Sequence, residues 1–115
     1  MITVAKLNEM GCNTKEGLAR CMNNEKFYIK MVMMGLKDKN FGALDKAVAE
    51  KNIKAMEDVS HALKGVMGNL AITPLYKLFE QMNTMLKPDN YKPNADYTSV
   101  YKLIKDTREK FLSLL

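Results

Sequence analysis

The chain has 115 residues, of which 47% are hydrophobic and 27% are charged, and its formal net charge is +5. This length and composition exclude an intrinsically disordered chain and suit one domain with a single core. There is no run of about 18 apolar residues that would predict a membrane span. The first residues also lack the apolar stretch of a signal peptide. We therefore expect a single soluble domain, residues 1–115, in the cytoplasm.

The positive charge is spread along the chain rather than gathered in one segment. No block of five like charges occurs, whereas nucleic-acid-binding proteins usually carry a basic stripe or an aromatic platform. We expect no nucleic-acid partner. A mild positive field would instead favour an acidic partner or a phosphoryl group.

Cys12 and Cys21 are the two cysteines, and His61 is the single histidine. Their spacing matches no zinc motif, and one histidine cannot complete a usual zinc-binding set. We expect no metal site and two reduced thiols, since a structural disulfide is uncommon in a small cytosolic protein.

The apolar residues recur at helical spacing throughout, and no strand or hairpin signal is present. Residues 3–9 predict one or two helical turns that end at Gly11. Asn13 and Glu16 resemble a capping box that opens a short helix reaching about Met22. Asn23 or Asn24 is expected to cap the next helix. A further short helix carries Leu44, Ala47 and Val48.

In the second half, Thr73 is expected to be an N-cap residue and Pro74 the first helical residue. Residues 87–94 predict a loop because they contain two prolines and no apolar period. The fold class predicted is all-α: an antiparallel four-helix bundle with short additional N-terminal helices covering one end. Its four main helices are expected near residues 24–38, 52–71, 73–87 and 95–114.

The central helix carries two stripes. His61, Lys64, Gly65 and Gly68 follow the spacing i, i+3, i+4 and i+7, so they share one face. This face lies roughly 140° around the helix from the apolar stripe, which predicts an exposed imidazole. The apolar stripe consists of Ile53, Met56, Ser60, Leu63, Met67 and Leu70.

Gly65 and Gly68 are unusual on one face of a helix. Each costs about 1 kcal/mol relative to alanine, so they are expected to allow close approach to the backbone. One of them could instead be a C-cap residue. Met67 and Leu70 argue against that interpretation, because they continue the apolar period beyond both glycines.

The pentapeptide His61-Ala62-Leu63-Lys64-Gly65, followed by Gly68-Asn69-Leu70, closely resembles the His-x-Leu-Lys-Gly motif of histidine-phosphotransfer (HPt) domains. The flanks, residues 17–20 and 24–28, are similar to the entry helices of that family. The resemblance covers roughly residues 10–87.

The resemblance implies a phosphorelay carrier. His61 would be the phosphoacceptor, usually through Nε2, and would take a phosphoryl group from a receiver-domain aspartate or a histidine kinase. Lys64 would stabilise the transferred charge, and Gly65, Gly68 and Asn69 would form the surface that the partner approaches. Such domains have no kinase activity of their own, and no glycine-rich phosphate loop occurs here.

The resemblance also concerns partners and cofactors. The expected partner is the receiver domain of a response regulator or of a hybrid histidine kinase. The chain itself would need no cofactor, since any magnesium would belong to the partner's acidic pocket. We expect a monomer.

Many family members add an amide from the following helix. In an antiparallel hairpin that turns near Ile72, position 83 is level with His61, so Asn83 is favoured. Gln81 would lie about 3 Å from that level and on the opposite flank. An ordinary exposed polar role for Asn83 is an equal alternative.

Three positions depart from the family pattern, namely Ser60, Val66 and Ala71, and none of them removes the nucleophile.

A docking module that binds a receiver without transferring phosphate is the first alternative function. A plain helical scaffold or oligomer subunit is the second, and the two solvent-facing glycines argue against it. An independent hydrolase is the weakest alternative, since no catalytic partner accompanies His61.

Overall fold

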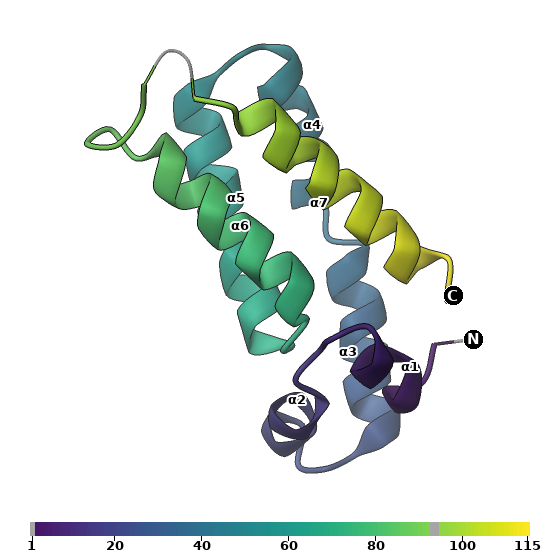
Figure 1. Cartoon of the computed structure of the whole chain (residues 1–115). Helices are drawn as coiled ribbons and strands as arrows, with labels where there is room; N and C mark the ends of the chain where they lie inside the picture. Colours follow the sequence, from purple (N-terminus) through teal and green to yellow (C-terminus); the bar gives the residue numbers. More distant parts are fainter. Residues whose placement is uncertain (1, 93–94) are drawn as a thin grey trace.

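A computed structural model describes residues 2–92 and 95–115 of the chain (Figure 1). Within these residues the protein is all-helical, as predicted, and no strand is present. Pro93 and Asn94, the end of the predicted loop, lie outside the described residues. The helices are α1 (Val4–Glu9), α2 (Thr14–Arg20), α3 (Glu25–Leu36), α4 (Asn40–Ala49), α5 (Ile53–Asn69), α6 (Thr73–Leu86) and α7 (Tyr97–Leu112).

Asparagine side chains begin three of these helices. The Oδ1 atoms of Asn13, Asn24 and Asn52 each accept a backbone N–H three residues further on, at 3.0–3.3 Å. Such a bond stabilises a helix by about 1 kcal/mol. The caps predicted at Asn13 and at Asn23 or Asn24 are confirmed, the latter at Asn24.

The start of α6 differs from the prediction. Ile72 is the N-cap residue, and no side chain caps the helix. Thr73 has a tertiary role instead: its hydroxyl accepts the backbone N–H of Asn13 at 3.1 Å and donates to the carbonyl of Ala71. The hydroxyl therefore joins the N-terminal segment to the α5–α6 turn. Pro74 was predicted to be the first helical residue, but the helix begins at Thr73, so Pro74 is the second residue of its first turn.

Helices α5 and α6 form an antiparallel pair, with α4 packed along α5 and α7 along α6 (Figure 1). Tyr101 and Lys105 of α7 bind Asp45 of α4. Burial raises the pKa of Asp45, but these hydrogen bonds and the charges of Lys105 and Arg108 outweigh it and lower the pKa.

The place of α3 differs from the sequence prediction. The expected bundle contained residues 24–38, but α4, shorter than α3, lies beside α5. Helix α3 instead groups with α1 and α2 toward one end of the molecule (Figure 1). Periodicity gives the length and buried face of each helix, but it does not determine which helices become neighbours.

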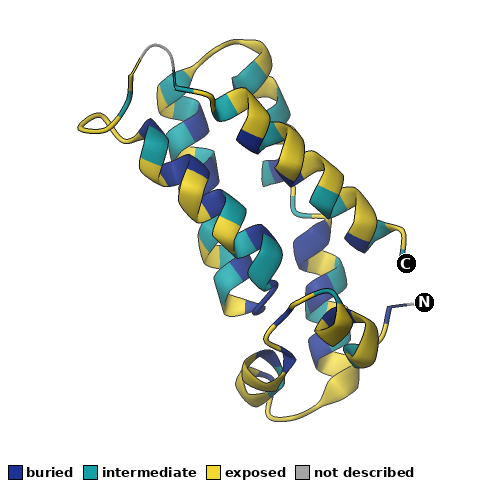
Figure 2. Cartoon of the chain, viewed as in Figure 1, coloured by how far each residue is buried: buried dark blue, intermediate teal, exposed yellow. Residues whose placement is uncertain are grey.

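The buried residues line the inner faces of the helices (Figure 2). Phe41 of α4 and Phe79 of α6 pack with ring centroids 5.8 Å apart. The Cζ atom of Arg108 lies 4.1 Å from the centroid of the Phe41 ring, and Nε of Arg108 donates a hydrogen bond to the carbonyl of Leu36. Through these two contacts the long side chain of Arg108 is half-buried against α3 and α4. The largest fully buried side chains include Tyr28, Phe79, Phe111, Leu36, Met56, Leu63, Met67, Ile72 and Met82.

The turn between α5 and α6 is a Schellman motif. The backbone N–H of Ile72 donates to Met67, and that of Ala71 donates to Gly68. Ala71 has a φ of 57°, a left-handed conformation in which glycine is the usual residue. Position 71 is therefore the one position of this turn where the backbone favours glycine.

Among the described residues, no helix combines the length and the apolar content needed to cross a bilayer. Cys12 and Cys21 are free and buried. Burial raises the pKa of Cys12 to about 11, although a backbone hydrogen bond from Thr73 opposes the shift.

Candidate functional site

The exposed face of α5 carries His61. The imidazole side chain is exposed, whereas the neighbouring Ser60 is completely buried. The buried residues of α5 are Met56, Ser60, Leu63 and Met67, which are members of the predicted apolar stripe. The predicted orientation of the two stripes is therefore confirmed, and His61 faces solvent.

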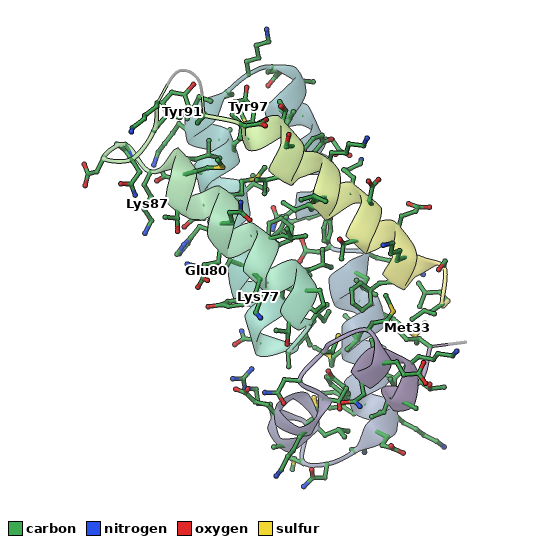
Figure 3. All side chains as sticks on the ribbon, in the orientation of Figure 1. Met33, Lys77, Glu80, Lys87, Tyr91 and Tyr97 are labelled. Carbon is green, nitrogen blue, oxygen red and sulfur yellow. The ribbon has the colours of Figure 1, made fainter. Side chains whose placement is uncertain are left out.

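Lys64 lies one turn after His61 and is half-buried. It contributes to a shallow hollow of about 500 Å³ between α5 and α6. Lys77 and Glu80, labelled on α6 in Figure 3, belong to the same hollow. Its other lining residues are Gln81, Thr84, Met85 and Asn90.

The hollow carries two cations and one carboxylate. Glu80 accepts a hydrogen bond from the hydroxyl of Tyr76 at 3.2 Å. This bond raises the pKa of Tyr76. Lys64 and Lys77 have no ion-pair partner within residues 2–92 and 95–115. The hollow therefore offers two ammonium groups to an anion.

Asn83 does not lie where the sequence interpretation placed it. It is at the level of Ser60, but only 1% of it is exposed. Its Nδ2 donates to the carbonyl of Glu57 at 3.0 Å and to Oγ of Ser60 at 3.4 Å. Because these bonds hold the amide inside the α5–α6 interface, the proposed contact between Asn83 and a group on His61 is wrong.

Gln81 is the exposed amide of this region, and it shares the hollow with Lys64. This hollow was not predicted from the sequence. A signal for it is present in the sequence, since Lys77, Gln81 and Thr84 are spaced i, i+4 and i+7 and therefore share one polar face of α6. Axial level alone favours Asn83, but its place on the buried stripe of α6 directs its side chain into the core. That stripe contains Leu75, Phe79, Met82, Asn83 and Leu86.

The two glycines of the exposed face have different surroundings. A Cβ atom built on Gly65 meets no atom within 4 Å, so the backbone there is open to a partner. A Cβ atom on Gly68 lies 3.1 Å from the ring of Tyr76. The small size of Gly68 is therefore explained by packing within the chain, whereas nothing in the chain occupies the space at Gly65.

Asn69 is exposed at the end of α5. Its carbonyl and that of Gly68 accept hydrogen bonds from Arg20, at 3.1 and 2.6 Å. Arg20 also pairs with Glu16. The sequence did not indicate this contact, since the two segments are about 50 residues apart.

Comparison of the sequence with family models finds no match, and neither the curated proteins nor the solved structures compared with it give one.

Proposed function

We propose that this protein is a phosphoryl carrier of the histidine-phosphotransfer type. In this proposal, His61 accepts a phosphoryl group from a receiver-domain aspartate or a histidine kinase and passes it to another receiver. The observation that carries the proposal is the combination, on one face of α5, of the exposed His61, the half-buried Lys64 and the open backbone at Gly65.

The transfer step uses one lone pair of the neutral imidazole. One ring nitrogen attacks the phosphorus of the partner's aspartyl phosphate while the other ring nitrogen keeps its proton. The N–P bond forms as the P–O bond breaks, and the aspartate leaves as a carboxylate. The ammonium group of Lys64 would stabilise the phosphoryl oxygens as a compact positive charge.

Two features of the fold enter the proposal. We interpret α4, α5, α6 and α7 as the four antiparallel helices of a bundle, since α4–α5, α5–α6 and α6–α7 pack together and Asp45 joins α4 to α7. We also assign to Gln81, in place of Asn83, the amide that contacts the transferred group. Support comes from its exposure and from the hollow that it shares with Lys64.

The decisive experiment removes the imidazole. We expect His61→Gln to abolish uptake of radiolabelled phosphate from a panel of phosphorylated receiver domains, because this is the single histidine of the chain. The unfolding free energy should change by no more than about 0.5 kcal/mol, since the site is exposed. The label on the wild-type protein should be acid-labile and stable in alkali, as expected for a phosphoramidate.

Lys102→Gln is the matched control, because it replaces an exposed polar side chain on α7, and it should leave labelling unchanged. Labelling of His61→Gln at the wild-type rate would refute the carrier proposal. Receiver binding without labelling of the wild type would favour the docking module instead.

A second variant tests access to the face. Gly65→Gln places a side chain in open space, so we expect slower transfer and weaker receiver binding with a fold at least as stable as the wild type. Gly68→Gln is a poorer test, because its side chain meets Tyr76 and would disturb packing as well. Transfer by Gly65→Gln at the wild-type rate would show that the open backbone is not used by the partner.

A further inference from the structure

A second surface lies away from His61, between the N-terminal segment and α3. A groove of about 710 Å³ separates them. Residues of the N-terminal segment and of one side of α3 line it, and no residue of α5 does. We infer that this groove binds an acidic amphipathic helix of a partner protein, an interaction that is separate from phosphoryl transfer.

The floor of the groove is apolar. Ile2, Val4 and Ala5 line one side, and Ile29 and Met33 (labelled in Figure 3) line the other. Methionine side chains are flexible and polarisable, and they adapt to apolar partners of different shape. Such a floor suits the apolar face of a helix, whose anchors recur at i, i+3 and i+4.

Met34 stands at the edge of this floor. It is 57% exposed and also borders a smaller hollow next to Val66 and Asn69 of α5. An exposed methionine of this kind gives a partner apolar contact area, and its contact with the partner removes no side chain from the core.

The rim of the groove is basic. Lys26, Lys30 and Lys37 line it, and all three are exposed. No ion pair of the described residues involves any of them. Glu25 is the one acidic residue of the lining. The rim therefore presents a net positive charge to whatever occupies the groove.

The spacing of these charges favours a peptide over a single anionic group. Lys26 and Lys37 are about 16 Å apart along α3, from a rise of 1.5 Å per residue. A fatty acid carries one carboxylate and would engage one end of this row. A helix with several glutamates on its polar edge can face all three ammonium groups.

The same charges disfavour a second copy of this chain. In a symmetric dimer each groove would face the same groove of the other copy, which would bring the two rows of lysines together. Like charges across an interface cost several kcal/mol. Carboxylates of an acidic partner would instead be attracted to these lysines.

The test uses a labelled synthetic peptide of 15 residues, helical, with leucines on one face and glutamates on the other. We expect saturable binding by fluorescence anisotropy, weakening as salt is raised. Amide shifts of the nitrogen-15-labelled full chain should concentrate on α1 and α3. Two matched peptides, with lysines replacing the glutamates or alanines replacing the leucines, should bind at least about tenfold more weakly.

Variants then locate the site. Lys30→Glu with Lys37→Glu should weaken binding at least about tenfold, because two of the three positive charges on the rim reverse. Lys87→Glu with Lys102→Glu changes the net charge equally at exposed positions outside the groove. It should change binding less than about twofold. Met34→Gln should weaken binding without loss of stability, since its side chain is already exposed.

Several results would overturn the inference. These are no binding of the acidic peptide, equal binding of the basic peptide, or shifts confined to α5 and α6. Binding of dodecanoate to the groove without binding of the peptide would assign it to a fatty acid. Concentration-dependent dimerisation abolished by Lys30→Glu with Lys37→Glu would assign it to a second copy. None of these results depends on labelling of His61, so this inference and the carrier proposal fail separately.

Discussion

The middle of α5 and its C-terminal end belong to one helix but have opposite surroundings. In the middle, His61 is exposed, and a Cβ atom added to Gly65 would meet no atom within 4 Å. At the end, Arg20 binds the carbonyls of Gly68 and Asn69, and the buried hydroxyl of Tyr28 donates to the carbonyl of Leu70 at 2.8 Å.

The difference shows that a glycine pattern on one helix face can have two causes. The open glycine leaves space that nothing in the chain fills, whereas the glycine near the turn makes room for a side chain of this protein. Substitutions in the middle of α5 should therefore change interactions with partners. Substitutions around its end should change folding stability.

The largest expected effect on stability comes from Gly17→Ala on α2. A Cβ atom there would lie 2.5 Å from the ring of Tyr28. That ring cannot shift without straining the hydrogen bond that its hydroxyl donates to the carbonyl of Leu70. Overpacking of this kind costs about 1–3 kcal/mol, measured by urea unfolding. Gly42→Ala is the control, since a Cβ atom there meets open space, and it should be neutral or stabilising. A stable Gly17→Ala protein would show that the packed end of α5 tolerates rearrangement.

Ala71→Gly should have a smaller effect and the opposite sign. Ala71 has a φ of 57°, and a left-handed conformation costs a non-glycine residue about 1–2 kcal/mol. Glycine removes this strain but raises the entropy of the unfolded chain, so we expect a gain of about 1 kcal/mol in thermal unfolding. Ala62→Gly on the exposed face is the control and should lose about 1 kcal/mol. Equal losses in both variants would show that the turn is unstrained.

The most direct comparison is between Gly65→Ala and Gly68→Ala, and the second of these variants has the smallest expected effect. In the helix interior, alanine is favoured over glycine by about 1 kcal/mol. Gly65→Ala should show this gain in chemical unfolding. Gly68→Ala should show little or none, because its Cβ atom approaches Tyr76 at 3.1 Å. Equal gains at both positions would remove the distinction between the two regions.

The sequence by itself determined the helices and the exposed side of α5. Helical spacing is a local property, so the stripe that contains Ser60 and Leu63 predicted both the burial of that face and the exposure of His61. Asparagine caps are equally local, since the side chain bonds to the backbone three residues away. These features needed no knowledge of neighbours.

The tertiary structure alone decided which helices are neighbours and what fills the space beside each glycine. The place of α4 beside α5, the use of Thr73 by Asn13 and the burial of Asn83 against Glu57 depend on segments distant in the sequence. Gly65 and Gly68 look alike in a helical pattern, and Tyr76 distinguishes them only once α6 has packed against α5. Local periodicity determines the direction in which a side chain points, and packing between helices determines what it meets there.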